Sequence, residues 1–472
     1  MPDDAAARSH PDPSDSVLDL VGGTPMVRLR SVVDGAVTPV YGKAEYLNPG
    51  GSLKDRIGLA IVEDAEREGE LQPGGTIVEG TSGNTGVGLA MAAAVKGYRC
   101  VFAIPDKMSA EKVRLLKGFG AEVIVTPAAV DPDHPDYYGN VARRIARERP
   151  GAVLADQFYN PVNPEAHYRT TGPEIWEQTG GRITHFVASA GTGGCISGAA
   201  RYLKERNPEI RVVAGDPVGS IYRHYAATGE KTSGSPYKVE GVGNDKIPDT
   251  LHFDVIDEFR EVGDREAFLM ARRITREEGL FVGGSTGLNV LVAARVAREV
   301  DDPGACIVTI LCDTGERYLS KLYDDAWMRE NRMLEPDRVT ARYLLETKGA
   351  DTPAGLVAVD TDTPVRKALE LLEAHGVSQL PVMGSDGCVG SVTEGGLMAA
   401  VLREPGRLDD PVEALADEPF PEVEEDAELE DLNRTLRRDV PAVLVTGQAG
   451  YRGILTRYDL LHHLMGDRGG PS

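Results

Sequence analysis

The residue whose setting best suits covalent chemistry is Lys54, which lies in the run NPGGSLKDRIG at 48–58. The alternating apolar run at 39–47 predicts a strand that ends at the Pro-Gly-Gly turn, and the amphipathic run that follows predicts a helix. Lys54 is therefore expected at a strand-to-helix corner, with Asp55 in the first helical turn, where the helix dipole favours an acid. Turn glycines around a lysine near a helix N-terminus favour loss of its proton, so the amine can act as a nucleophile. A lone lysine of this kind is better explained as solvent-exposed, so the interpretation depends on the motifs further along the chain.

The turn TSGNTG at 81–86 follows an apolar run and opens a predicted helix. Small hydroxyls, an amide and backbone N–H groups would converge there on the positive end of the helix, which suits a carboxylate or another anion. A simple N-cap turn would explain the same residues equally well.

A second turn, GTGGC at 191–195, also follows an apolar run and opens a predicted helix. Three glycines in four residues allow backbone amides to wrap a phosphate. The turn has no Gly-Lys-Ser/Thr, and Ile196 stands where the dinucleotide fingerprint needs its last glycine. We therefore expect a phosphate that does not belong to a nucleoside triphosphate. The turns GGSTG at 283–287 and CDTGERYLS at 312–320 add small polar groups, although each could be only a turn.

A reactive lysine, a phosphate loop, an anion-binding turn and a small hydroxyl turn together favour pyridoxal phosphate as cofactor. The lysine would form the covalent link, and the glycine loop would hold the phosphate. The TSGNTG turn would hold the carboxylate of an amino acid, and a serine would hydrogen-bond the pyridine nitrogen without charging it.

The elements that must position these residues follow an α/β pattern from about residue 17 to 330. Short β-branched runs predict strands at 76–80, 100–105, 121–127, 183–190, 211–216 and 305–312. Helical patterns lie between them, for example at 86–97, 110–120 and 195–208. This alternation predicts a doubly wound α/β protein with mostly parallel sheets, arranged as two lobes with a ligand cleft between them.

After a charged, helical connector at 331–350, two segments at 351–405 and 406–468 resemble each other. Each predicts a short strand, a helix, two strands joined by a turn, and a second helix, so the region is a tandem α+β repeat. The acidic run at 422–431 is expected to be a solvated loop and helix start, not a metal site.

Composition excludes several classes of function. The chain has 472 residues, of which 41% are hydrophobic, and this predicts two or three domains with ample core. A net charge of −23 argues against nucleic acid or an anionic membrane as partner. Five cysteines without a C-x-x-C pair predict free thiols in a reducing cytoplasm, with no zinc or disulfide framework. We expect no membrane span and no signal peptide, and a disordered tail at 1–16.

The four motifs NPGGSLKDRIG, TSGNTGVGLA, GTGGCISGAARYLKE and GGSTG resemble, in order, the fold-type II pyridoxal-phosphate family of cysteine synthases and cystathionine β-synthases. The resemblance covers about residues 17–330 and implies that Lys54 forms the Schiff base and shuttles the proton of the substrate Cα. It also implies that the cofactor is bound by Asn84 at its ring oxygen, by Ser285 at its pyridine nitrogen, and by the phosphate loop of Gly191, Thr192, Gly193, Gly194 and Cys195. The residues that match the grip on the substrate carboxylate are Thr81, Ser82, Thr85 and Gln157.

The tandem repeat resembles a CBS domain pair, a regulatory module for adenosyl ligands. In the second repeat this resemblance places Thr456 and Asp459 at a ribose, whereas Gly396 stands at the aspartate position of the first repeat. The combination of synthase and C-terminal pair favours the cystathionine β-synthase branch of the family. No haem is expected, since no cysteine precedes Cys100. The resemblance also implies a homodimer or a larger homo-oligomer.

The sequence departs from the family pattern at four positions. Gly80 replaces the usual proline, and Cys195 replaces the usual threonine of the phosphate loop, which removes one hydroxyl but leaves the backbone amides. Asn244 and Lys246 stand where Tyr and Phe are typical in cystathionine β-synthases. The second pair borders the active-site entrance in the family, so it bears on the thiol acceptor and the leaving group.

Three functions are compatible with these patterns. The first is β-replacement on L-serine by homocysteine, which gives cystathionine and water. The second is a cysteine synthase that uses O-acetylserine or O-phosphoserine with sulfide. The third is an adenosyl-ligand sensor with a degenerate synthase half, which the intact Lys54 and Asn84 argue against. Threonine dehydratase is a weaker option because its regulatory domains are of a different type.

Overall fold

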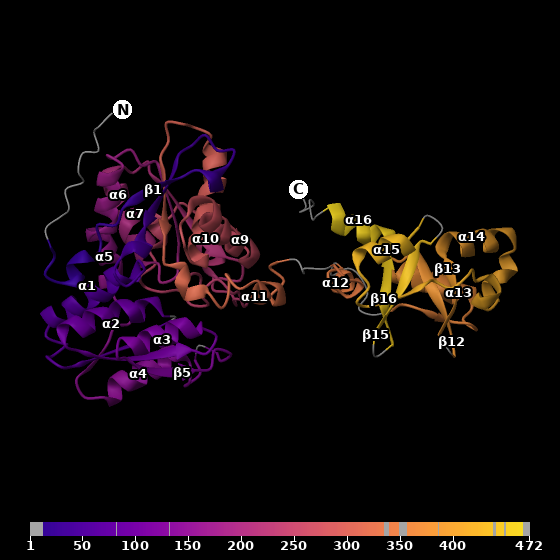
Figure 1. Cartoon of the computed structure of the whole chain (residues 1–472), viewed down its shortest axis with the longest axis horizontal. Helices are drawn as coiled ribbons and strands as arrows, with labels where there is room; N and C mark the ends of the chain where they lie inside the picture. The colour runs from indigo at the N-terminus through magenta and orange to yellow at the C-terminus, as the bar shows by residue number, and fades with distance from the viewer. Residues whose placement is uncertain are drawn as a thin grey trace, which may run out of the picture. The chain divides into compact units, whose positions relative to one another are not determined.

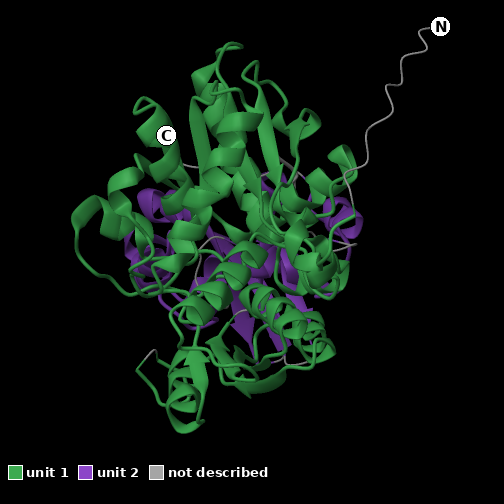
Figure 2. Cartoon of the chain, turned by 90° about the vertical axis from the view of Figure 1, so that its left-hand side faces the viewer, with its two compact units in different colours: residues 1–334 green, residues 335–472 purple. Residues whose placement is uncertain are grey.

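The computed structural model describes residues 13–81, 83–131, 133–334, 339–348, 356–385, 387–437, 440–447 and 450–465. The chain divides into two compact units, Met1–Leu334 and Glu335–Ser472, which Figure 2 distinguishes by colour. Each unit has its own sheets and its own core, so each is described separately below.

The larger sheet of the first unit has six strands in the order β1-β2-β10-β7-β8-β9. Every neighbouring pair is parallel except β1, which runs antiparallel to β2. The strands are β1 (Met26–Leu29), β2 (Val40–Ala44), β7 (His185–Ser189), β8 (Arg211–Pro217), β9 (Glu258–Val262) and β10 (Ile307–Leu311).

The smaller sheet has four parallel strands in the order β5-β4-β3-β6. Its strands are β3 (Thr76–Gly80), β4 (Arg99–Pro105), β5 (Glu122–Thr126) and β6 (Ala152–Leu154). The two sheets confirm the predicted doubly wound α/β class, and each predicted strand is present with its ends moved by three residues or fewer.

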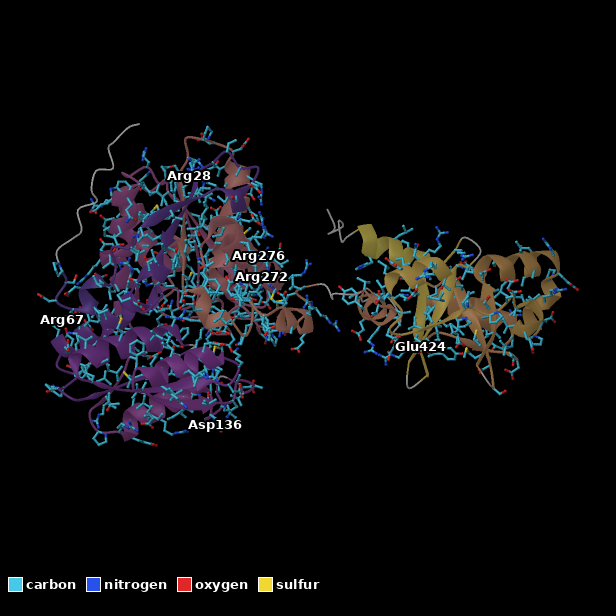
Figure 3. The ribbon with its side chains drawn as sticks, viewed as in Figure 1. Arg28, Arg67, Asp136, Arg272, Arg276 and Glu424 are labelled. Carbon is cyan, nitrogen blue, oxygen red and sulfur yellow. The ribbon has the colours of Figure 1, made fainter. Side chains whose placement is uncertain are left out.

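Helices cover the sheets of the first unit, and Figure 1 shows α2, α3 and α4 grouped around the smaller sheet. The helices are α1 (Lys54–Arg67), α2 (Asn84–Lys96), α3 (Ala110–Gly118), α4 (Tyr138–Glu148), α5 (Val162–Arg169), α6 (Thr171–Gln178), α7 (Gly194–Arg206), α8 (Tyr222–Thr228), α9 (Asp264–Arg273), α10 (Gly284–Val300) and α11 (Asp325–Glu330). The side chain of Arg272, labelled in Figure 3, pairs with Asp325 and so ties α9 to α11.

The strands of the larger sheet are buried on both faces. Along β10, Ile307 and Leu311 belong to one hydrophobic cluster, while Val308 and Ile310 belong to another. Alternate residues of a strand point to opposite faces, so this division places a core on each side of the sheet. A sheet covered on both faces explains why its strands read as continuous apolar runs.

The second unit contains two copies of one fold. Its sheets have the orders β11-β12-β13 and β14-β15-β16, and the first strand of each is parallel to the second. The hairpins match residue for residue at an offset of 63, since Gln379 pairs with Thr393 and Ala442 pairs with Thr456. The elements are β11 (Val359–Asp360), α13 (Val365–His375), β12 (Gln379–Gly384), β13 (Gly387–Thr393), α14 (Glu394–Arg403), β14 (Glu422–Glu424), α15 (Leu429–Thr435), β15 (Ala442–Gly447), β16 (Gly450–Thr456) and α16 (Arg457–Met465).

Two sequence-based expectations change in this region. The acidic run was expected to be a loop and helix start, but Glu422–Glu424 forms β14, which pairs with β15. The strand forms despite its charges because Glu422 and Glu424 point to solvent while Val423 packs inward. The expected connector contains α12 (Ala341–Glu346), whose Ala341 and Leu344 belong to the core of the second repeat.

Within the residues that the structure describes, no helix is both long and apolar enough to cross a membrane.

Candidate active site

One cavity of about 760 Å³ in the first unit gathers most of the chemistry-bearing residues. Its volume lies in the range usual for small-molecule sites. The residues expected from the sequence that line it are Lys54, Asn84, Thr85, Gln157, Gly191, Thr192, Gly193, Cys195 and Ser285. Thr81 and Gly194 belong to the same turns behind this lining, and Ser82 lies outside the described residues.

Lys54 is the first residue of α1, and its backbone lies against α2. A Cβ added at Gly88 would come within 2.6 Å of the carbonyl oxygen of Lys54, so glycine is required for α2 to approach this closely. Among the described residues, the Lys54 amine has no hydrogen-bond or ion-pair partner. Burial lowers its pKa, although nearby acidic groups such as Asp313 act in the opposite direction. The amine is thus set to lose its proton more readily than an exposed lysine.

Asp55 behaves differently from the expectation of an acid stabilised by the helix dipole. It is fully buried, and burial raises the pKa of its carboxyl to about 7 despite the nearby Arg317. Its Oδ2 accepts a hydrogen bond from the Gly50 amide at 2.6 Å. The side chain therefore fixes the glycine turn in front of Lys54, and desolvation outweighs the dipole.

The glycines of the phosphate loop leave no room for side chains. A Cβ at Gly191 would overlap the carbonyl oxygen of Gly241, and a Cβ at Gly194 would overlap Oδ1 of Asn163. Gly193 has a φ of +83°, which disfavours any other residue. The amide of Asn163 donates to Thr192 Oγ1 at 2.9 Å and so holds the loop from behind. Backbone N–H groups at the start of α7 are left to bind an anion.

Hydrogen bonds join the residues that are expected to bind the substrate carboxylate. Thr85 Oγ1 donates to Gln157 Oε1 at 2.5 Å, and Gln157 Nε2 donates to Glu79 Oε1 at 3.0 Å. The hydroxyl of Thr81 accepts from the Gly83 amide at 3.0 Å, so it shapes the turn. Glu79 is a residue of this site that the sequence analysis missed, because nothing near it in sequence marks a buried acid.

Asn84 is held by two residues from the last predicted turn. Its Nδ2 donates to Asp313 Oδ2 at 2.7 Å, and its Oδ1 accepts from Arg317 at 2.5 Å. Asp313 also accepts from Tyr318 at 2.6 Å. An amide nitrogen carries two hydrogens, so Asn84 can still donate one to a cofactor oxygen. The run CDTGERYLS was noted only as a polar turn, and this role depends on contacts across more than 200 residues.

Ser285 lies in the first turn of α10 and hydrogen-bonds the thiol of Cys312, whose pKa burial raises to about 12. The amide of Asn289, one turn further along α10, donates to the same sulfur at 3.2 Å. Cys312 therefore stays protonated at neutral pH, and the group beside Ser285 is uncharged.

A buried network of ion pairs stabilises the position of α1. Arg56 pairs with Glu45 at 2.7 Å and with Glu174 at 2.7 Å, and Lys43 pairs with Glu174 at 2.6 Å. Burial alone would raise the pKa of Glu45, but the charge and hydrogen bonds of Arg56 lower it to about 2. The sequence analysis did not find this network, since its members come from three separate segments.

The departures from the family pattern cluster beside the cavity. A Cβ at Gly80 would lie 3.0 Å from the ring of Tyr138 and 3.1 Å from Gly139, so a proline there would press on α4. Asn244 lines the main cavity and caps its own loop by accepting from the Asp245 amide at 2.8 Å. Lys246 lies with its amine 5.2 Å from the ring centre of Tyr137.

In the second unit, Thr456 and Asp459 contact each other. Thr456 Oγ1 donates to Asp459 Oδ2 at 2.7 Å, and Lys348 pairs with the same oxygen at 3.0 Å. In the first repeat, Thr393 accepts from the Gly396 amide at 3.1 Å. Both threonines thus stand at the start of a helix, and the residue three positions further on is a carboxylate only in the second repeat.

The residues of the main cavity fit pyridoxal phosphate. Lys54 supplies a partner-free amine of lowered pKa, and the glycine loop supplies backbone donors that a Cβ would block. Ser285 supplies a hydroxyl beside an uncharged thiol, which suits a pyridine nitrogen that carries no proton. Among the described residues, no group of three or more His, Cys, Asp or Glu side chains could hold a metal ion.

Comparison with known proteins gives two family matches. The family model described as "Pyridoxal-phosphate dependent enzyme" matches residues 17–313, and the CBS domain model matches residues 354–403 and 412–466.

Similar proteins extend the match over nearly the whole chain. The chain is 38% identical to the cystathionine beta-synthase of Oryctolagus cuniculus over 97% of its own length and 86% of that protein. It is 37% identical to the cystathionine beta-synthase of Dictyostelium discoideum over 96% of its length and 92% of that protein. The solved O-acetylserine dependent cystathionine beta-synthase from Helicobacter pylori matches with a TM-score of 0.60 and 35% identity, covering 65% of this chain and 98% of that one.

Proposed function

Because this chain belongs to the pyridoxal-phosphate-dependent enzymes and carries a CBS domain pair, we propose that it catalyses β-replacement on L-serine by homocysteine, giving cystathionine and water. The observation that carries the proposal is one cavity that contains the unpaired Lys54 amine, the glycine loop and Gln157. The relatives that match almost the full length are cystathionine beta-synthases, which supports this reaction over others of the family.

Each part of the cavity has a role in this reaction. Bound pyridoxal phosphate would withdraw electrons from the amino acid, which makes the Cα proton acidic and lets the β-substituent leave. The backbone amides at 191–195 would hold the phosphate, and Ser285 would donate to the pyridine nitrogen. Asn84 would donate its free amide hydrogen to the ring oxygen. Thr85 and Gln157, with Thr81 and Ser82 in the turn before them, would hold the carboxylate of the substrate.

Lys54 has two roles in this proposal, as the covalent anchor of the cofactor and as the base that takes the Cα proton at its Nζ. A buried amine of lowered pKa suits both, because only the neutral amine attacks a carbonyl or accepts a proton. The C–O bond at the β-carbon of serine breaks, and a C–S bond to homocysteine forms in its place. The thiol proton leaves with the hydroxyl group as water.

A second candidate is β-replacement on O-acetylserine or O-phosphoserine with sulfide, which gives cysteine. Two observations favour it: Asn244 lines the cavity where the family usually has an aromatic residue, and a solved relative is named for O-acetylserine dependence. A smaller polar side chain at the entrance changes the shape and polarity that an acceptor thiol meets.

We also propose regulation and assembly on the basis of the second unit. The CBS pair would bind an adenosyl ligand at Thr456 and Asp459, with a weaker site or none at Gly396. The chain would act as a homodimer or larger homo-oligomer. Its five unpaired cysteines support a reducing compartment such as the cytoplasm.

The test is a side-by-side assay on the full-length protein loaded with cofactor. Serine with homocysteine is compared with O-acetylserine and sulfide, and cystathionine and cysteine are followed by mass. Faster cystathionine formation supports the first reaction, and faster cysteine formation supports the second. No product from either pair would overturn both and favour the sensor function. Lys54→Ala is the matched control, since it removes the essential amine and should abolish product with either pair.

A further inference from the structure

Glu79 is a buried acid that the reaction described above does not use. It is the fourth residue of β3 and is 2% exposed. Its Oε1 accepts from Gln157, whereas its Oε2 has no hydrogen-bond partner among the described residues. A buried polar atom without a partner costs free energy, so a role at the neighbouring site is a reason for its presence.

Glu79 contacts Gln157, one of the residues that are expected to bind the substrate carboxylate. Gln157 lines the main cavity, and its amide is fixed at both ends, by Thr85 at the oxygen and by Glu79 at the nitrogen. These two bonds fix one of the two orientations of the amide, in which Nε2 also makes a long contact of 3.4 Å with the Gly80 carbonyl oxygen, a weak bond that a carboxylate can replace. Without Glu79, the amide could turn over and present its oxygen to the substrate carboxylate, which would repel it.

We propose that Glu79 is a positioning residue, which orients the Gln157 amide toward the carboxylate of the amino acid substrate and whose own charge weakens the grip on that carboxylate. The inference rests on the proposed function, because it takes the ligand of Gln157 to be an amino acid carboxylate. Glu79 does not line the main cavity, so it acts without touching the substrate, through its bond to Gln157 and through its charge.

The surroundings of Glu79 keep it neutral at physiological pH. Burial is the largest cause and the charge of Asp156 adds to it, so the pKa of Glu79 is raised to about 8, although Gln157 and the backbone amides at 156 and 157 lower it. Glu79 also borders a small cavity of about 40 Å³, which is distinct from the main one. Its lining includes Arg143 and Tyr138 from α4, and Tyr137 and Lys246 from flanking loops.

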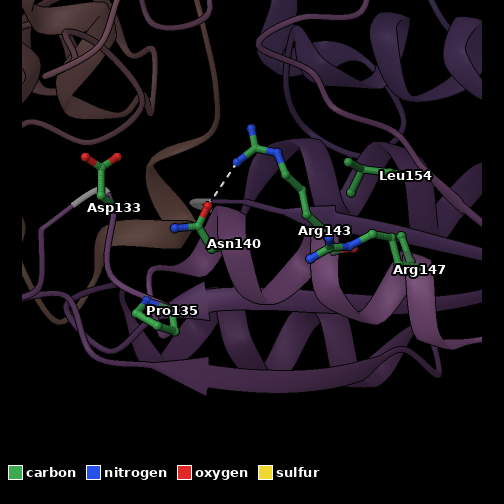
Figure 4. A pocket seen from close by; sticks show the side chains of 7 residues that line it. Asp133, Pro135, Asn140, Arg143, Arg147 and Leu154 are labelled. Carbon is green, nitrogen blue, oxygen red and sulfur yellow. Dashed lines mark hydrogen bonds between the residues drawn. The ribbon is translucent and has the colours of Figure 1, made fainter.

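A wider groove of about 610 Å³ lies on the outer side of the same region, on α4, and Figure 4 shows its lining. Arg143 and Leu154 border both the groove and the small cavity, and Asn140 accepts a hydrogen bond from Arg143 at 3.2 Å. Arg143 also lies 3.8 Å from Asp156. Asp156, whose charge raises the pKa of Glu79, therefore lies beside a cation of α4.

The sign of the pH dependence follows from these charges. Below pH 8 Glu79 is neutral and places no negative charge behind the Gln157 amide. As the pH rises through the pKa, Glu79 becomes negative and repels the carboxylate. If the bound carboxylate raises the pKa by about one unit, as a like charge commonly does, affinity falls about fivefold between about pH 7 and about pH 9.

The experiment measures the dissociation constant of serine at several pH values from the change in visible absorbance of the cofactor-loaded, full-length protein. Wild type is compared with Glu79→Gln, which keeps the shape and cannot ionise. Glu122→Gln is the matched control, since Glu122 is a half-exposed acid in the same sheet. We expect the ratio of wild-type to Glu79→Gln dissociation constants to rise about fivefold over this range and the ratio for Glu122→Gln to stay flat. Equal pH profiles for wild type and Glu79→Gln would overturn the proposal.

A second variant covers the case in which Glu79→Gln does not load cofactor. Asp156 has a φ of +47°, a conformation that asparagine tolerates well, so Asp156→Asn should fold normally. It removes a charge that raises the pKa of Glu79, so the alkaline loss of serine affinity should move to lower pH. A profile that stays in place or moves to higher pH would refute the role of Glu79. Failure of the proposed function looks different, because no amino acid would then change the absorbance of the wild type.

Discussion

The fit of the phosphate loop against Asn163 leads to a prediction for the substitution Gly194→Ala. The backbone of Gly194 is not in the left-handed region, so any effect must be steric. The new Cβ would overlap Oδ1 of Asn163 and lie 2.8 Å from its Nδ2. Asn163 is 1% exposed and cannot move aside into solvent.

Displacing Asn163 would break two hydrogen bonds, one to the Gln157 carbonyl at 2.8 Å and one to Thr192 Oγ1 at 2.9 Å. Each such bond contributes about 1 kcal/mol, and overpacking adds about 1 to 3 kcal/mol. We therefore expect a loss of about 3 to 5 kcal/mol in the stability of the loaded first unit. Because the displaced groups hold the phosphate loop, the cofactor dissociation constant should rise by more than about tenfold.

The assay combines denaturant unfolding with cofactor titration followed by visible absorbance. Gly118→Ala is the matched control, because a Cβ there has no neighbour within 4 Å. It should leave both quantities unchanged or slightly raise stability. The same substitution made in an Asn163→Ala background should cost much less, since the clash is gone. Unchanged cofactor affinity in Gly194→Ala, or an equal loss in both backgrounds, would refute the reasoning.

Three further predictions follow from the same structure. Arg56→Met should destabilise the first unit by about 3 to 5 kcal/mol in denaturant unfolding, because it leaves the buried Glu45 without its paired cation and Glu174 with Lys43 alone. The depressed pKa of Glu45 means that this pairing stabilises the wild type above pH 4.5 and is lost as the pH falls toward 2, so the variant should lose less stability on acidification. Cys195→Thr should lower the cofactor dissociation constant about fivefold by adding one hydroxyl hydrogen bond, and an unchanged constant in an absorbance titration would count against that bond. A protein ending at residue 334 should fold, bind cofactor and keep its activity, since the first unit has its own core, and loss of cofactor from it would contradict this.

The sequence identified the turns of the active site because each is marked locally. Glycines followed by an apolar helix predict a strand-to-helix corner, and the structure places the corners at Lys54, Asn84, Gly194 and Gly284 in helix first turns. In parallel sheets these corners meet at one edge, so four local motifs were enough to predict one cleft. The position of Lys54 depends further on Gly88, which looked like an ordinary helix residue and is needed for α2 to touch α1.

The residues that the sequence analysis missed act through partners far away in the chain. Asp313 and Arg317 hold Asn84 from the far end of the catalytic unit, and their run was noted only as a turn. Glu79 lies in the run predicted as a strand at 76–80, and nothing in that run marks its acid as buried. Whether an acid is buried depends on what packs against the strand, and this information is not local.

The CBS pair illustrates how one sequence pattern can serve two physical roles. Thr456 and Asp459 were assigned to a ribose through a family resemblance, yet the Asp459 carboxylate also accepts from the Thr456 amide at 2.6 Å and so closes the start of α16. Such a bond at a helix N-terminus stabilises the helix without any ligand. Thr393 makes the corresponding turn with Gly396 and no carboxylate, so the fold does not require the acid. The presence of Asp459 in only one repeat therefore needs a reason beyond capping. Its pairing with Lys348 at 3.0 Å supplies one, because it joins the segment that follows α12 to the start of α16.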